Sequence, residues 1–176
     1  GGEVVPGWGA GARGGRARGR DTGQADARLG ASVLDITVNR TADWDALMAY
    51  CRVSAMPVGR FVLDVCGEDR PVWPLSDALC AALQVINHLQ DVGKDYRAID
   101  RVYLPADMLA AAGVPVEALG AAAASPALRE VIIEVARRAR QLLRASAPFS
   151  LAMRYTRLAA DVSIIPVLAG ALADAL

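Results

Sequence analysis

Apolar residues recur at helical spacing from Thr41 to the C-terminus. Thr41 is a suitable N-cap, and acidic residues follow it; Leu47, Tyr50 and Cys51 then recur at intervals of three and four. Pro57 should kink this first helix, because proline removes a backbone hydrogen bond from a helix interior. Strand alternation and hairpin dipeptides are missing from this pattern, which therefore predicts an all-α fold. The expected helices cover 42–66, 75–97, a short segment after Pro105, 126–146 and 151–174.

The first 33 residues have a different composition from the rest. They contain 10 of the 16 glycines and five arginines, with few periodic apolar residues. Such a segment buries too little surface to offset the entropy lost on ordering. We therefore expect 1–33 to be a disordered or non-native Gly/Arg-rich tail, and 34–176 to form a helical domain. An RNA-binding role for this tail is disfavoured, because Trp8 is its one aromatic residue.

Charge and hydropathy disfavour several classes of partner. The chain has 19 basic and 19 acidic residues and a formal net charge of +0, so nothing points to a nucleic-acid partner. The N-terminus has no apolar signal region, and the apolar stretch 162–173 is far shorter than the roughly 20 residues that span a bilayer. We expect a cytoplasmic protein with no obligate protein partner. Peripheral contact with the inner membrane stays open.

Cysteine spacing argues against a zinc site. Cys51, Cys66 and Cys80 form no CxxC pair, and His88 is the single histidine of the chain. We therefore expect three buried free thiols in a reducing compartment.

The segment LQVINHLQDVGKD carries the candidate chemistry. Asn87, Asp91 and Asp95 are four residues apart, so a helix would stack them along one face, with Gln84 in the same arc. Two carboxylates one turn apart repel each other in water, but a Mg²⁺ ion between them and a phosphate would relieve that repulsion. From spacing alone, an ordinary polar helix face is the favoured interpretation.

Context changes that interpretation. The stretch NHLQDVGKDYRAIDRVYLP resembles the second aspartate-rich motif of the squalene/phytoene synthase family and the Arg-x-Tyr-Leu-Pro segment that follows it. Upstream, YCRVSAMPVGR resembles the family's Tyr-Cys motif. Within the family, SAMPVGR and INHLQD resemble the bacterial hopanoid branch, the hydroxysqualene synthases. The resemblance covers roughly 34–176.

The resemblance implies a partial isoprenoid-synthase helical bundle around a long apolar cavity. In the family, two aspartate-rich motifs face each other across the cavity mouth and hold Mg²⁺ against the substrate diphosphate. By match, Asn87, Asp91 and Asp95 would be the metal and diphosphate residues of the second motif. Tyr50 and Gln84 would line the reaction centre near the forming cation.

Four further residues would bind the substrate by the same resemblance. Arg101 and Tyr103 would hold or screen the diphosphate. Val58 and Gly59 would border the prenyl chains, with glycine permitting a close approach. The implied substrate is a prenyl diphosphate, either presqualene or farnesyl diphosphate.

The implied chemistry is ionisation followed by water capture. Presqualene diphosphate would lose its diphosphate in an apolar cavity, and water would capture the cation to give hydroxysqualene. The sequence does not show which residue positions that water. For His88 and Gln90, support of the metal face or packing in the bundle is the favoured role.

The resemblance breaks upstream of Tyr50. The family's first aspartate-rich motif should lie there, but Asp21 and Asp26 stand in no helical context. We therefore expect an N-terminally incomplete chain that is inactive alone. One alternative is a squalene or phytoene synthase that condenses two prenyl diphosphates. Another is a non-catalytic relative like the mitochondrial complex I assembly factors, although the intact aspartate-rich helix favours an enzyme.

Overall fold

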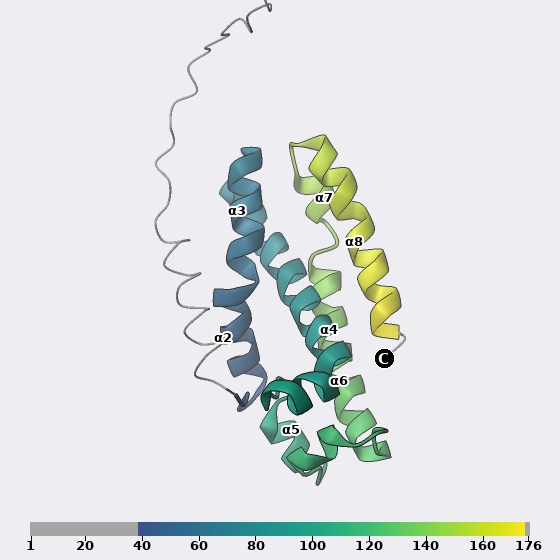
Figure 1. Cartoon of the computed structure of the whole chain (residues 1–176). Coiled ribbons are helices and arrows are strands. Elements are labelled where there is room, and N and C mark those ends of the chain that lie inside the picture. Colours follow the sequence, from purple (N-terminus) through teal and green to yellow (C-terminus); the bar gives the residue numbers. More distant parts are fainter. Residues whose placement is uncertain (1–38, 175–176) are drawn as a thin grey trace, which may run out of the picture.

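The computed structural model describes residues 39–174, and every regular element within them is a helix (Figure 1). Strand-type pairing in this part of the chain is limited to an isolated parallel bridge between Arg40 and Val102. The predicted all-α fold is confirmed. The predicted tail, 1–33, lies outside the described residues. The elements, with η marking a 3-10 helix, are α2 (Trp44–Ser54), α3 (Met56–Cys66), η1 (Arg70–Val72), α4 (Trp73–Ile99), α5 (Ala106–Ala111), η2 (Val116–Gly120), α6 (Pro126–Ala145), α7 (Phe149–Ala152) and α8 (Thr156–Asp174).

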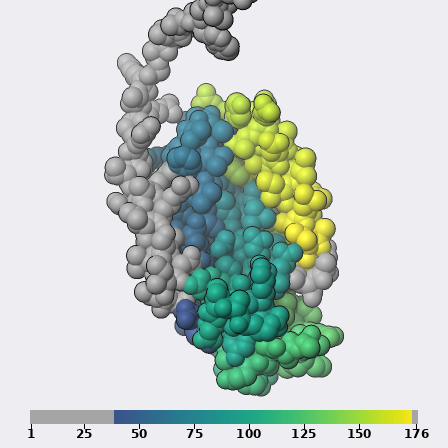
Figure 2. Space-filling view, in the orientation of Figure 1, coloured from purple at the N-terminus to yellow at the C-terminus, as the bar shows by residue number. Residues whose placement is uncertain are grey.

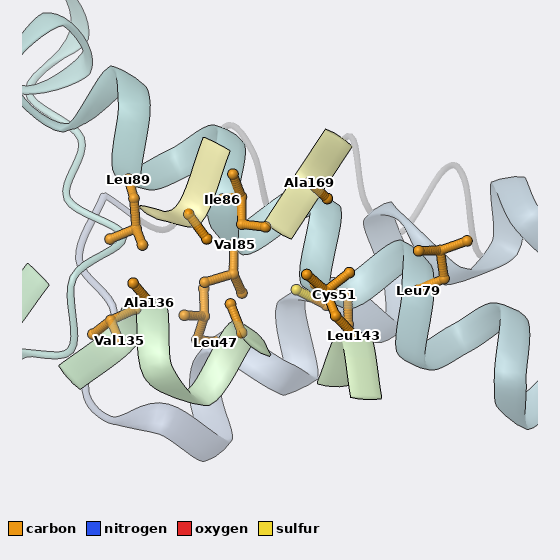
Figure 3. Close-up of a cluster of buried hydrophobic side chains, with 14 of the residues drawn as sticks. Leu47, Cys51, Leu79, Val85, Ile86, Leu89, Val135, Ala136, Leu143 and Ala169 are labelled. Carbon is orange, nitrogen blue, oxygen red and sulfur yellow. The ribbon is translucent and has the colours of Figure 1, made fainter. Parts of the chain in front are cut away.

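Helix α4 is the centre of the bundle and contacts α2, α3, α6 and α8. Its apolar side carries Val85, Ile86 and Leu89, which are all buried. Figure 3 shows these side chains gathered with Leu47 of α2 and Val135 of α6 in one apolar cluster. Each such aliphatic side chain contributes about 1.5–3 kcal/mol when fully buried. This cluster fixes which side of α4 faces inward, and therefore which side is left for polar residues.

The predicted first helix is two helices that meet at Ala55. Pro57 lies in the first turn of α3, where its missing N–H removes no intrahelical bond, so the chain breaks before the proline instead of kinking at it. The N-cap of α2 is Asp43, not Thr41 as predicted. The Asp43 side chain accepts a hydrogen bond from the Ala46 amide at 2.8 Å. The Thr41 backbone pairs instead with the segment that precedes α5.

The predicted last helix, 151–174, is also two helices, α7 and α8. The cause of the break is Glu68, whose carboxylate is buried at the end of α3. It accepts hydrogen bonds from the backbone amides of Arg154, at 2.9 and 3.0 Å, and Tyr155, at 2.6 Å. Tyr155 directly precedes α8, so Glu68 satisfies one of the amides that the start of a helix leaves unpaired and also holds Arg154 just before it. Pro166 lies inside α8 and does not end it.

Gly59 sets how closely α3 approaches α4. A Cβ atom at this position would lie 2.5 Å from Ser76 Oγ and 2.6 Å from Cys80 Sγ, both on α4. The room that glycine provides is therefore occupied by a neighbouring helix. Whether Gly59 also borders a prenyl chain stays a prediction.

Gly59→Ala should lower the free energy of unfolding by about 1–3 kcal/mol, because an added methyl group overpacks the α3–α4 contact. The matched control is Gly170→Ala in α8, where a Cβ would meet nothing within 4 Å. That change should be neutral or stabilise by about 0.5–1 kcal/mol through helix propensity. Urea denaturation of the two variants checks this difference, and equal losses would contradict the packing account.

Helices α3 and α8 expose many large apolar side chains. Figure 2 shows the molecule hollowed between these two helices, with α4 behind. The exposed side chains are Val58, Phe61, Val62 and Val65 of α3 and Ile164, Val167, Leu168 and Leu172 of α8. By length and composition alone, Trp44–Cys66 and Thr156–Ala173 could cross a membrane, with mean hydropathy of 1.2 and 1.5. Length and composition do not place a helix in a bilayer, so the cytoplasmic location stays a prediction.

Candidate functional site

A polar stripe runs along α4 on the side turned away from α6. Because α4 is continuous over Trp73–Ile99, Gln84, His88, Asp91 and Asp95 fall within an arc of about 60° at 100° per residue. Asn87 lies at the edge of this stripe and is exposed.

The opposite arrangement, with the apolar side of α4 turned outward, is excluded. Val85 is 1% exposed and Leu89 is 5% exposed, and both belong to the core. The residues predicted to bind metal therefore share the open side of α4, as their spacing predicted.

The two carboxylates of the stripe are accessible. The Asp91 side chain is 46% exposed and lies 3.3 Å from Lys94 Nζ in an ion pair. Asp95 is partly buried near the end of α4, where its backbone carbonyl accepts from the Arg101 amide at 3.3 Å. No cluster of three or more His, Cys, Asp or Glu side chains able to hold a metal occurs within residues 39–174. Two carboxylates and an amide are hard oxygen donors that suit Mg²⁺, provided that other ligands complete its coordination.

An aromatic cluster beside the stripe brings three chain segments together. The His88 ring of α4 stacks on Tyr103, which follows α4, with centroids 3.4 Å apart and planes at 13°. Tyr50 of α2 packs against both rings, at 5.8 Å from His88 and 5.5 Å from Tyr103. Gln84 reaches the same cluster, since its Nε2 lies 3.1 Å from His88 Nε2.

Arg101 extends this cluster towards the end of α4. Its guanidinium donates to the Tyr103 hydroxyl at 3.2 Å, and its Cζ lies 5.9 Å from the centroid of the same ring. The structure thus brings together four of the predicted site residues: Tyr50, Gln84, Arg101 and Tyr103. Val58, on α3, is exposed.

The sequence predicted that His88 supports the metal face or packs in the bundle, but it did not identify the residues that His88 contacts. The structure shows that His88 contacts all three of Tyr50, Gln84 and Tyr103. A signal was present in the sequence, because residues four apart on a helix face each other and His88 follows Gln84 by four. The long-range partners could not be read from any such spacing.

The cysteine of the Tyr-Cys motif is a packing residue. Cys51 is fully buried, and this burial raises the pKa of its thiol to about 12. Burial also raises the pKa of Cys80. All three thiols are free, but Cys66 and Cys80 are only partly buried, so the prediction of three buried thiols was right for Cys51 alone.

Alkylation should separate these thiols. At pH 8 only roughly one Cys51 in ten thousand would be a thiolate, because a raised pKa keeps the thiol protonated until the pH approaches that value. Iodoacetamide should therefore modify Cys66 well before Cys51, as read by peptide mass spectrometry. Labelling in urea is the control, since unfolding should make the two rates similar. Equal alkylation rates for Cys51 and Cys66 in the folded chain would contradict the burial of the Cys51 thiol.

Comparison with known proteins identifies the family. The family model for squalene/phytoene synthases matches residues 25–176. The hydroxysqualene synthase of Zymomonas mobilis subsp. mobilis is 52% identical over 142 residues, which are 81% of this chain and 48% of that protein. The hydroxysqualene synthase of Rhodopseudomonas palustris is 52% identical over 132 residues, which are 75% of this chain and 45% of that protein. This chain therefore spans about half the length of the curated relatives it matches.

A solved structure agrees with the sequence matches. Squalene synthase HpnC from Alicyclobacillus acidocaldarius has a TM-score of 0.82 and 31% identity to this chain, and the match covers 89% of this chain and 59% of that one. The helical arrangement, the matched motifs and the family match over residues 25–176 agree. The chain belongs to the squalene/phytoene synthase family.

Proposed function

We propose that this chain forms part of an enzyme that converts presqualene diphosphate to hydroxysqualene. The observation that carries the proposal is the identity of 52% to the hydroxysqualene synthases of two bacteria. Since the chain spans 48% and 45% of the length of these relatives, the proposed activity is that of the complete enzyme. We expect residues 1–176 alone to turn over nothing detectable. A cytoplasmic location with peripheral membrane contact is part of the proposal, since substrate and product are lipids.

Asn87, Asp91 and Asp95 are the proposed ligands of Mg²⁺. Their oxygens lie on the open side of α4, where substrate phosphates and water could complete an octahedral shell. When bound there, the ion would neutralise the charge that develops on the departing diphosphate. Retention of both carboxylates disfavours a non-catalytic relative.

Arg101 and Tyr103 are proposed to hold the diphosphate next to these ligands. The Arg101 guanidinium is oriented by the Tyr103 hydroxyl at 3.2 Å, and a planar guanidinium suits phosphate oxygens. Tyr50 packs against Tyr103 at 5.5 Å. Because His88 and Arg101 already lie against the Tyr103 ring, the ring proposed to face the cation is that of Tyr50. Aromatic faces stabilise a nearby cation by about 0.5–2 kcal/mol.

The proposed reaction begins with cleavage of the carbon–oxygen bond to the diphosphate, which leaves with both electrons. The cyclopropylcarbinyl cation would rearrange while the apolar cavity, which the family resemblance implies for the complete enzyme, excludes bulk water. One water then forms a carbon–oxygen bond with the cation, and a proton of that water leaves with the diphosphate. The sum is presqualene diphosphate plus water giving hydroxysqualene plus diphosphate.

A second candidate is condensation of two farnesyl diphosphates towards squalene. The specific observation in its favour is the similarity to squalene synthase HpnC, at 31% identity. Identity to the hydroxysqualene synthases is higher, at 52%, so we rank condensation second.

Product analysis separates the two candidates. The test uses a completed enzyme, which carries residues 25–176 of this chain in place of the matching part of the Zymomonas mobilis hydroxysqualene synthase. With Mg²⁺, we expect hydroxysqualene from presqualene diphosphate and little product from farnesyl diphosphate, both read by mass spectrometry. Squalene without hydroxysqualene would overturn the proposal in favour of the second candidate.

A further inference from the structure

His88 and Gln84 make a contact whose chemistry can be read from its atoms. The Gln84 amide nitrogen lies 3.1 Å from the imidazole Nε2. An amide nitrogen can only donate, so His88 Nε2 accepts and the ring carries its proton on Nδ1. The Gln84 amide then turns its carbonyl oxygen away from the ring, and that oxygen can only accept hydrogen bonds.

Packing restrains the imidazole that sets this orientation. The ring stacks on Tyr103, with centroids 3.4 Å apart, and lies 5.8 Å from the Tyr50 ring, so side chains from two other segments hold it against α4. A ring fixed on its face and edge cannot rotate without breaking the contact with Gln84. The Tyr103 ring, in turn, is held between His88 and the Arg101 guanidinium.

We propose that His88 is a positioning residue of the reaction centre, which fixes the Gln84 carbonyl oxygen as the acceptor that orients the capturing water. This inference rests on the proposed function. The water donates one hydrogen to Gln84 Oε1 and directs its oxygen lone pair to the cation. A carbon–oxygen bond forms, and the other proton of the water leaves with the diphosphate. His88 itself exchanges no proton; it acts through the orientation of Gln84.

The first test uses the chain as it is. Because His88 is the single histidine, ¹⁵N-histidine labelling gives one pair of ring signals that need no assignment. At pH 8 we expect the Nδ1-protonated tautomer, which Gln84→Leu should convert largely to the Nε2-protonated form. The matched control is Gln141→Leu, which removes an exposed amide from α6 and should change nothing. An Nε2-protonated wild type, or an unchanged tautomer in Gln84→Leu, would overturn the proposal.

The second test measures products in the completed enzyme described above. His88→Phe keeps a stacking ring but has no acceptor for Gln84, whereas His88→Gln keeps an acceptor and loses the ring. We expect His88→Phe to lower the ratio of hydroxysqualene to other products about tenfold, and His88→Gln to restore most of it. A role limited to packing predicts the reverse order, which would overturn the proposal, as would unchanged ratios in both. If the unaltered enzyme makes no hydroxysqualene, the proposed function fails, and the tautomer still decides whether His88 fixes Gln84.

Discussion

Asp91→Ala in the completed enzyme should lower the turnover of presqualene diphosphate by several orders of magnitude. The carboxylate is accessible, at 46% exposure, and lies on the open side of α4 with Asp95. Its proposed interaction strengthens as the diphosphate leaves, so its removal raises the barrier and not only the binding constant. Each 1.4 kcal/mol lost in the transition state lowers the rate about tenfold. Turnover at saturating substrate is the quantity to measure.

Glu130→Ala is the control for this prediction. Glu130 is an exposed carboxylate on α6, the helix that packs against the opposite, apolar side of α4. Removing it changes the net charge by the same amount as Asp91→Ala and should leave turnover within about twofold. Rates near the wild-type value for Asp91→Ala would reject the metal assignment.

Glu68→Ala should lower the free energy of unfolding by about 2–4 kcal/mol. The buried carboxylate accepts from two backbone amides at 2.6–3.0 Å, and alanine would leave those donors without their acceptor. Hydrogen bonds to a charged group contribute about 1.5–3 kcal/mol, and an unsatisfied buried donor adds a further penalty. We expect α8 to detach first, because this contact fixes its start. Urea denaturation gives the total loss, and amide hydrogen exchange locates it.

Asp69, the residue after Glu68, supplies a matched control for Glu68→Ala. Asp69 also binds Arg154, through an ion pair at 2.9 Å whose side chains are 58% and 73% exposed. Exposed ion pairs are worth about 0–1 kcal/mol, so Asp69→Ala should cost less than about 1 kcal/mol. Similar losses for the two variants would contradict the role assigned to Glu68.

The parts of the fold that depend on local pattern could be predicted. The apolar periodicity predicted the ends of α4 and α6 to within about two residues, because each helix is amphipathic and has a proline in its first turn. Ser125, for example, caps α6 by accepting from the Leu128 amide at 3.2 Å, directly before Pro126 in the first turn. The spacing of the α4 stripe likewise followed from helix geometry alone.

The predictions that failed concern features that depend on residues distant in sequence. Thr41 and Asp43 are both acceptable caps by type, and the choice was made by the pairing of the Thr41 backbone with Val102, 61 residues away. The break between α7 and α8 depends on Glu68, 86 residues before Arg154. The orientation of the His88 ring depends on stacking against Tyr103, and no local spacing in the sequence specifies that contact. Site chemistry was recognisable from motifs, whereas the contacts that orient it were not.

Isotope labelling of the product oxygen tests the central claim most directly. The completed enzyme is given presqualene diphosphate and Mg²⁺ in ¹⁸O-labelled water, and the alcohol product is examined by mass spectrometry. Ionisation with water capture predicts hydroxysqualene whose hydroxyl oxygen comes from the solvent. Squalene alone, or an alcohol that keeps the unlabelled oxygen of the original phosphate ester, would contradict the account.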